Sequence, residues 1–460
     1  MILGRTFAVR RLERASVDPK KYDAHSNITD VTKDGVLQYH YGYDMMNQLV
    51  SVDDKMNGKV YNYTYDAGGN LISETVTDSN GTTSNAYEYN NSNWGDVLTS
   101  YNGQNITYDE IGNPLTYRDG MSMTWKNGRQ LATLTNGDTS ISYGYDSGSL
   151  RTTKTVNGVK YTYAYLNGQL MYETRGDAKF YYSYDANGIL YNVRYTLTDG
   201  GTEYSYYYTH NSRGDIIGIY NGAGELKAHY EYDTWGNVIS ITDNNGNAIT
   251  NPNHIGNLNQ FRYRGYYQDT ETGLYYLMSR YYDPITHRFI NADGYFQSGG
   301  NILDANMHSY CGNNPIMFAD PTGLCYEPQY TSAGTYIGKY WVIKTAVPGV
   351  PGFCNSCKSN GPNSGNKYYV ESNKYYVESS KNNKNTKGDS NWTTRKDSKK
   401  GSENRQKSGD RERNVAHPNG EEHSRVPKGN GVKHLTETPF EERMGNFGIC
   451  LACAVAVISR

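Results

Sequence analysis

The sequence predicts a mainly β fold, in which β-hairpins repeat along the chain and wind into a partial shell that precedes a small, largely irregular or α+β C-terminal domain. Tyrosine accounts for 47 of the 460 residues. Many tyrosines occur in pairs two positions apart, followed by Asp and a Gly-Asn step. The pattern returns about every 20 residues, and a period of this size is the signature of stacked supersecondary units.

The repeated unit has the sequence features of a hairpin. One clear copy covers residues 61–71, and another covers residues 230–238. Residues two apart share one face of a strand, and a Gly-Asn step supplies the positive φ that a hairpin loop needs. Because one hairpin cannot bury its own face, we expect residues 30–324 to form one continuous antiparallel sheet. This sheet should curl into an open half-shell with the paired tyrosines on a common side.

The composition is that of a globular protein with two or more structural units. The chain is 36% hydrophobic and has a formal net charge of −2, so nucleic-acid binding by the whole protein is not expected. Residues 447–458 form an apolar run that is too short to span a bilayer, and we expect no stable membrane insertion. The N-terminal residues, several of them Arg, lack the apolar core of a signal peptide.

The chain is expected to divide into regions that differ in kind. Tyrosine thins out after the repeats, and Lys and Arg outnumber Asp and Glu between residues 381 and 430. A heptapeptide at residues 366–372 is repeated at once at residues 373–379, which is typical of a low-complexity linker. We therefore expect a repeat shell segment, a denser core, a linker and a variable C-terminal domain, covering residues 1–258, 259–324, 325–380 and 381–460.

The denser block carries three motifs in a fixed order. They are Arg-Tyr-Tyr-Asp-Pro from Arg280, Asn-Asn-Pro from Asn313, and Asp-Pro-Thr-Gly-Leu from Asp320. With these motifs, residues 30–324 closely resemble the YD repeats and the repeat-associated core of the RHS/teneurin family. The resemblance implies a teneurin-like YD shell, which is an RHS-type shell, with the core closing one end and a variable toxin carried inside.

This resemblance also implies a biological setting. The chain would be the C-terminal portion of a polymorphic toxin that acts in bacterial competition. It would be secreted or held at the cell surface through a missing N-terminal region, and a cognate immunity protein would be its partner. Nucleic acid in the target cell would be the substrate if the effector is a nuclease.

The family cleaves itself after the Leu of its last motif, which would be Leu324 here. By resemblance, the group for this aspartyl-type autoproteolysis would be Arg280, Asp293 and Asp320. Two carboxylates brought close cannot both ionise cheaply, so one would hold a proton and polarise the carbonyl while the other activates water. Arg280 would orient one of them. The alternative is that these Asp residues only cap turns.

Two positions depart from the pattern of the family. Gly294 follows Asp293 where the family usually has Pro, so the ring that fixes the backbone is missing. His287 stands where the family commonly has Gly.

The tail contains a short stretch with the residue types of a metal-dependent nuclease. A His or a carboxylate would activate water or hold a divalent metal, and Arg or Lys would neutralise phosphate. The alternative is a solvated or disordered basic run. The candidate catalytic residues are His417, His423, Glu421 and Glu422. The candidate nucleic-acid-binding residues are Arg411, Arg413, Arg425 and Lys428.

Two Cys-x-x-Cys pairs in the tail have the spacing of tetrahedral zinc ligands, although the gap between the pairs is long. Zinc is one interpretation, and free thiols or disulfides are the other. The four residues are Cys354, Cys357, Cys450 and Cys453. Two other functions stay open for the whole chain. One is a non-enzymatic cell-surface or wall-binding repeat protein whose exposed aromatics bind glycans, and the other is an inert truncated fragment.

Overall fold

The computed structural model describes residues 20–294, 302–324, 326–328, 366–371 and 374–379. The chain divides into two compact units, Met1–Ser380 and Lys381–Arg460, and all described residues belong to the first. Antiparallel β-strands make up most of the regular structure in these residues, which confirms the mainly β fold class. The C-terminal domain predicted for residues 381–460 lies outside them.

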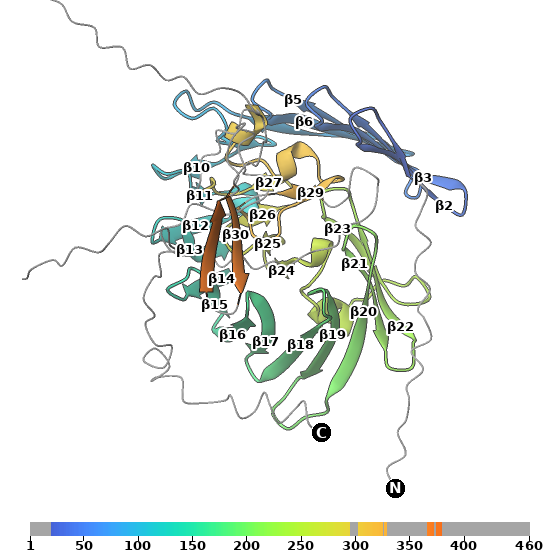
Figure 1. Cartoon of the computed structure of the whole chain (residues 1–460), viewed down its shortest axis with the longest axis vertical. Helices are drawn as coiled ribbons and strands as arrows, with labels where there is room; N and C mark the ends of the chain where they lie inside the picture. The colour runs from blue at the N-terminus through green and yellow to red at the C-terminus, as the bar shows by residue number, and fades with distance from the viewer. Residues whose placement is uncertain (1–19, 295–301, 325, 329–365, 372–373, 380–460) are drawn as a thin grey trace, which may run out of the picture. The chain divides into compact units, whose positions relative to one another are not determined.

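The hairpin array forms two long sheets in which each strand pairs with the next one along the chain (Figure 1). The first sheet has nine strands: β1 (Lys20–Tyr22), β2 (Ile28–Lys33), β3 (Val36–Tyr43), β4 (Leu49–Asp54), β5 (Lys59–Tyr65), β6 (Leu71–Asp78), β7 (Gly81–Glu88), β8 (Ser100–Tyr101) and β9 (Gln104–Asn105). The second sheet has fourteen: β10 (Thr107–Tyr108), β11 (Pro114–Thr116), β12 (Ser122–Lys126), β13 (Gln130–Asn136), β14 (Thr139–Tyr145), β15 (Arg151–Val156), β16 (Val159–Leu166), β17 (Gln169–Arg175), β18 (Ala178–Tyr184), β19 (Leu190–Thr196), β20 (Tyr204–His210), β21 (Ile216–Asn221), β22 (Leu226–Tyr232) and β23 (Val238–Thr242).

The prediction of one continuous sheet over residues 30–324 was wrong. The hairpin array breaks into two sheets between β9 and β10, and the residues after the array form separate small sheets. Ile106 separates β9 from β10, and its side chain is buried in the core. Its N–H donates to the carbonyl of Thr99, in register with the pairing of β8 and β9, so the chain at Ile106 is still bonded to the first sheet. The strands on both sides of Ile106 are only two residues long, and β9 does not pair with β10.

The paired tyrosines face a common side, as the repeat predicts. In β5, Tyr61 and Tyr63 are buried while Asn62 and Thr64 are exposed. The loop that follows is held by Asp66, whose carboxylate Oδ1 accepts hydrogen bonds from two backbone N–H groups of the loop at 2.8 Å each. The positive φ lies at a single Gly of this loop, which adopts φ +77°. Carboxylates cap the loops in the same way at Asp44, Asp109, Asp146, Asp185, Asp233 and Asp243.

Tyrosine hydroxyls fasten neighbouring hairpins together. The hydroxyl of Tyr65 donates to the carbonyl of Leu49 at 2.8 Å, and the hydroxyl of Tyr232 donates to that of Ile216 at 2.7 Å. In the hairpin that contains β12, Trp125 stands in place of a tyrosine and donates its indole N–H to a carbonyl of β11 at 2.6 Å. A buried Tyr or Trp needs a partner for its polar group, and here the preceding repeat supplies it.

The core block follows the array and is buried against it. Its elements are α1 (Ile255–Leu258), η2 (Tyr263–Gly265), a sheet of β24 (Tyr267–Asp269), β25 (Leu274–Tyr276), β26 (Tyr281–Asp283) and β27 (Arg288–Phe289), then η3 (Ile302–Ala305), η4 (Cys311–Asn313) and β28 (Phe318–Ala319), which pairs with β29 (Glu327–Pro328). Asn side chains of the block bind the hairpin loops. Asn313 donates to the carbonyl of Gly69 at 2.7 Å, and Asn314 donates to that of Asn47 at 2.9 Å.

The duplicated heptapeptide, inside the interval predicted as a linker, forms a hairpin of β30 (Asn366–Glu371) and β31 (Lys374–Ser379).

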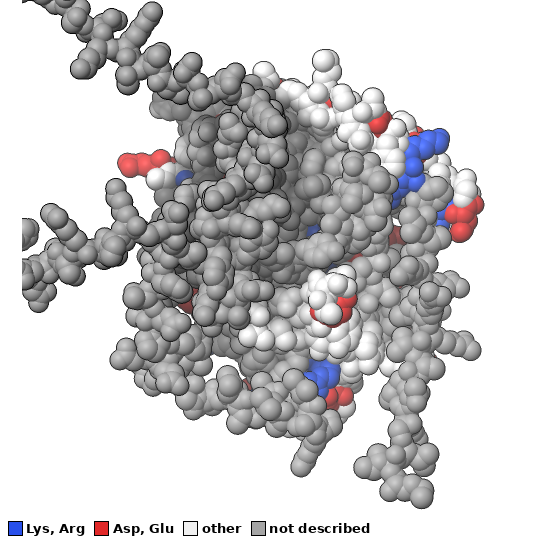
Figure 2. All heavy atoms as spheres, in the orientation of Figure 1, with Lys and Arg blue, Asp and Glu red and all other residues white. Residues whose placement is uncertain are grey.

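On the described surface in view, Figure 2 shows Lys and Arg in small groups next to Asp and Glu. None of the helices in the described part of the chain has both the length and the apolar character needed to cross a bilayer.

Candidate functional site

The structure brings together Arg280, Asp293 and Asp320, the three residues predicted as the cleavage group. One guanidinium nitrogen of Arg280, Nη2, lies 3.2 Å from Oδ2 of Asp293 and 3.3 Å from Oδ2 of Asp320. All three side chains are at most 7% exposed. A single buried cation therefore bridges two buried carboxylates that come from different parts of the core block. Their role in cleavage stays a prediction.

Arg280 is fixed by contacts on every part of its guanidinium group. The Nε–H donates to the carbonyl of Gly323, and Nη1 donates to the carbonyl of Met307 at 3.1 Å. The guanidinium carbon lies 3.6 Å from the centroid of the Phe289 ring, in the geometry of a cation–π contact. These contacts orient Arg280 before any reaction takes place.

Asp320 both caps a turn and faces Arg280. Its Oδ1 accepts hydrogen bonds from the N–H groups of Thr322 at 3.2 Å and Gly323 at 2.8 Å, while Oδ2 faces the guanidinium. Its own N–H donates to the hydroxyl of Tyr266 at 3.0 Å. Burial raises the pKa of Asp320 to about 6, although Arg280 and the two N–H groups act in the opposite direction. Asp320 therefore holds a proton in weak acid.

Gly323 allows the Asp-Pro-Thr-Gly-Leu motif to approach the backbone of the core block closely. It adopts φ +72°, and a Cβ there would lie 2.8 Å from the carbonyl oxygen of Leu277 and 3.0 Å from the nitrogen of Arg280. The preceding residue is held as well, because Ser279 donates its N–H and its hydroxyl to the carbonyl of Thr322 at 3.1 and 2.7 Å. The chain before the predicted scissile bond is thus fixed to the turn that carries Arg280.

Replacing Gly323 by Ala should displace the motif from Arg280. The positive φ costs about 1 kcal/mol for Ala, and the contacts with backbone atoms cannot be relieved by a side-chain rotation. We expect self-cleavage to slow at least about tenfold, measured as fragment formation on a denaturing gel. Gly294→Ala is the matched control, because nothing lies within 4 Å of a Cβ there. Equal rates for Gly323→Ala and the wild type would contradict the assigned role.

The two departures from the family pattern have structural explanations. His287 adopts φ +61°, the region that Gly enters without strain. Its ring stacks on Trp235 with centroids 4.6 Å apart, and burial lowers the pKa of the imidazole. Gly294 is exposed, and the N–H of Asp293 donates to the carbonyl of Met307 at 2.9 Å, which fixes the backbone where a Pro ring is absent.

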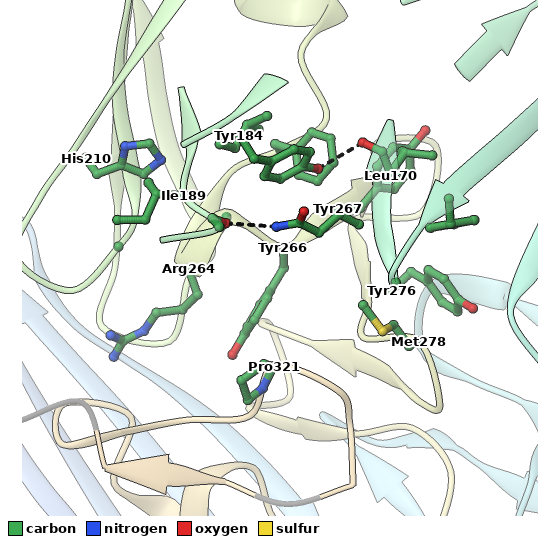
Figure 3. A pocket seen from close by; sticks show the side chains of 18 of the residues that line it. Leu170, Tyr184, Ile189, His210, Arg264, Tyr266, Tyr267, Tyr276, Met278 and Pro321 are labelled. Atoms are coloured by element: carbon green, nitrogen blue, oxygen red, sulfur yellow. Dashed lines mark hydrogen bonds between the residues drawn. The ribbon is translucent and has the colours of Figure 1, made fainter. Parts of the chain in front are cut away.

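A cavity of about 370 Å³ adjoins the Asp-Pro-Thr-Gly-Leu motif at Pro321. Aromatic and glycine residues of β16–β20 and of the core block line it, together with Pro321 (Figure 3). Tyr266 joins the cavity to the site, because its ring lines the cavity and its hydroxyl accepts the N–H of Asp320. Tyr184, which also lines the cavity, donates its hydroxyl to the carbonyl of Leu170 at 2.9 Å.

Two ion pairs that support the core block were not predicted. Arg118 from the array binds Asp283 with Nε–Oδ2 at 2.6 Å, and Arg151 binds Asp269 with Nη1–Oδ2 at 2.6 Å. Asp283 belongs to the Arg-Tyr-Tyr-Asp-Pro motif, and its place in that motif is the one sequence signal that could have identified it as a member of an ion pair. The array residues give no such signal, because ordinary repeat positions also carry Arg.

The sites predicted in the tail lie outside the described residues. They are the nuclease candidates His417, His423, Glu421 and Glu422, the phosphate-binding candidates Arg411, Arg413, Arg425 and Lys428, and the zinc candidates Cys354, Cys357, Cys450 and Cys453. In the part of the chain that the structure does describe, no group of three or more His, Cys, Asp or Glu is arranged to hold a metal ion.

An array of capped hairpins packed against a buried core block defines a YD-repeat shell protein. The model of the Teneurin YD-shell family matches residues 20–316, and the chain belongs to this family.

Similar proteins are much longer than this chain. It is 38% identical over 290 residues to the tRNA3(Ser)-specific nuclease WapA of Bacillus spizizenii and 36% identical over 295 residues to the tRNA nuclease WapA of Bacillus subtilis. Each match covers 61% of this chain but only 12% of the relative. The double-stranded DNA deaminase toxin A of Burkholderia cenocepacia is 26% identical over 381 residues, covering 76% of this chain and 24% of that protein.

Solved structures share the fold. The crystal structure of TcdB2-TccC3-TEV matches 67% of this chain and 17% of its own chain, with a TM-score of 0.53 and 19% identity. The Photorhabdus luminescens Tc holotoxin pore matches 70% of this chain and 17% of its own chain, with a TM-score of 0.51 and 17% identity. At these identities the likeness concerns the fold alone.

Proposed function

We propose that this chain is the C-terminal portion of an RHS polymorphic toxin, in which a YD-repeat shell and a self-cleaving core carry an effector. Cleavage after Leu324 separates the shell and core from residues 325–460. The observation that carries this proposal is the bridging of Asp293 and Asp320 by Arg280, beside the segment that ends at Leu324. Relatives that are named nucleases and a deaminase toxin support the same class of protein.

The proposed reaction is hydrolysis of the peptide bond between Leu324 and Cys325. Asp293 accepts a proton from the attacking water, whose oxygen forms the new bond to the carbonyl carbon of Leu324. Asp320 donates its proton as the C–N bond breaks, so that Leu324 leaves with a carboxylate and Cys325 with an amine. Arg280 offsets negative charge on the carboxylates and, through Gly323, keeps the chain beside them.

This mechanism predicts that cleavage slows as the pH rises above about 6. Asp320 has a pKa raised to about 6, so its proton is present below that pH and is lost above it. Because the donor must carry its proton, the rate should fall about tenfold per pH unit on the alkaline side. The measurement is the first-order rate of fragment formation in the full chain between pH 5 and 8. A rate that rises through this range would rule out Asp320 as the proton donor.

The effector proposed for residues 325–460 is a nuclease, with a cognate immunity protein as its partner. This region carries the clustered His, Glu and basic residues that hydrolysis of a phosphodiester needs. The four cysteines are proposed zinc ligands in the same region. Export or attachment at the cell surface is proposed from the family. Glycan binding by the array is less favoured, because Tyr61 and Tyr63 are buried rather than exposed.

Expression of residues 325–460 in a bacterial cell without an inhibitor should arrest growth and degrade nucleic acid. His417→Ala and His423→Ala should each relieve the arrest, since loss of one ligand or base lowers a hydrolytic rate by about 10²-fold or more. Total RNA and DNA on a gel report the outcome, with His434→Ala as a control outside the cluster. Arrest with intact RNA and DNA would exclude the nuclease and leave another kind of effector.

A further inference from the structure

Tyr326 lies two residues beyond the proposed scissile bond and packs against the core block. Its ring centroid is 5.2 Å from that of Phe318, at an interplanar angle of 69°. The backbone of Gly312 also lies beside the ring, since a Cβ there would be 3.1 Å from the Tyr326 hydroxyl and 3.3 Å from Cζ. Gly312 adopts φ +56°, a conformation that Gly enters without strain.

The strand that follows Tyr326 pairs with the strand that directly precedes the Asp-Pro-Thr-Gly-Leu motif. Phe318 pairs with Pro328 and Ala319 pairs with Glu327, in the antiparallel ladder of β28 and β29. Asp320 directly follows Ala319. The chain from Asp320 to Tyr326 is therefore a loop whose two ends are joined by this ladder, and the proposed scissile bond lies within the loop.

The two sides of this bond are held by different contacts. On the upstream side, Asp320, Arg280 and Ser279 fix the backbone at Thr322 and Gly323. On the downstream side, the described contacts are the Tyr326 ring and the β28–β29 ladder. Restricting a reacting bond on both sides favours a near-attack geometry, and a displacement of about 1 Å costs about 10²-fold in rate.

We propose that Tyr326 is a positioning residue, which clamps the downstream side of the scissile bond to Phe318 and Gly312. This inference rests on the proposed self-cleavage. The ring acts by packing on Phe318 and on the backbone of Gly312. Removing the ring should therefore change the rate of cleavage without changing its dependence on pH.

The test follows cleavage of the full chain carrying substitutions at Tyr326. Tyr326→Ala should lower the first-order rate about 10- to 100-fold, with the pH midpoint of the wild type. Tyr326→Phe keeps the ring and should cleave within about twofold of the wild type. Tyr181→Ala is the matched control, because Tyr181 is a partly exposed tyrosine on β18. Circular dichroism should show the same fold in all of them.

Two cleavage results would overturn the proposal. One is a wild-type rate for Tyr326→Ala, and the other is a loss in Tyr326→Phe as large as that in Tyr326→Ala. Hydrogen exchange of peptides covering residues 316–328 gives a reading that does not depend on cleavage. In an Asp293→Asn background, Tyr326→Ala should exchange faster there than the parent chain, and equal exchange would also reject the clamp. An uncut wild-type chain would instead reject the proposed function, and the exchange measurement would still decide the clamp.

Discussion

Asp320→Asn is expected to leave the chain uncut at Leu324, with the rate of self-cleavage lowered by at least about 10²-fold. The amide keeps the Oδ1 acceptor that receives the N–H groups of Thr322 and Gly323, so the turn cap is preserved. The substitution removes the proton of the Asp320 carboxyl, whose pKa is raised to about 6 by burial. The substitution therefore separates catalysis by Asp320 from its role as a turn cap.

Asp293→Asn should have a comparable effect, because it removes the second carboxylate that Arg280 bridges. Fragment formation by the full chain, followed on a denaturing gel, reports both variants. Asp185→Asn is the matched control, since Asp185 caps a hairpin loop by accepting two backbone N–H groups at Oδ1 but has no role in the site. Cleavage that survives both Asp293→Asn and Asp320→Asn would refute the assignment and leave turn capping as their function.

The second large effect is on stability, at the buried ion cluster of Arg151, Lys154 and Asp269. Asp269 accepts from Arg151 at 2.6 and 3.0 Å and from Lys154 at 3.0 Å, and all three side chains are at most 1% exposed. Burial alone would raise the pKa of Asp269, but the two cations hold it below its ordinary value. Asp269→Asn leaves the buried Arg151 with a neutral partner, while Lys154 keeps its ion pair with Glu271 at 2.9 Å. We expect a loss of about 3–5 kcal/mol in the free energy of unfolding.

Urea denaturation followed by tyrosine and tryptophan fluorescence measures this loss as a lower midpoint. The control is Asp199→Asn, which breaks the exposed ion pair with Lys179 and should leave the midpoint close to that of the wild type. Equal midpoints for Asp269→Asn and Asp199→Asn would show that the cluster does not hold the core block against the array.

The repeating part of the fold was predictable because its determinants are local. The alternation at Tyr61 and Tyr63 and the Asp66 loop lie within one hairpin, so their spacing specifies a shared face and a capped turn. The break at Ile106 was not predictable in the same way. The side chain of Ile106 is buried in a cluster that also contains core-block residues, which are distant in the sequence.

The candidate site was predictable only where the family motifs reach. The motifs include Arg280 and Asp320, and the structure brings both to Asp293. The supports from distant sequence were missed, because a pair such as Arg151 and Asp269 is separated by 118 residues and obeys no local pattern. Tyr326 was missed for a related reason, since its partner Gly312 looks like an ordinary loop residue until the chain folds back.

The mass of the purified full chain tests the central claim most directly. At about pH 5, intact-mass spectrometry should show two fragments in place of one chain. One should end at Leu324 with a free carboxylate and the other should begin at Cys325 with a free amine, their masses together exceeding that of the chain by one water. A single mass equal to that of residues 1–460, from a chain that circular dichroism shows to be folded, would contradict the assignment of Arg280, Asp293 and Asp320 to self-cleavage.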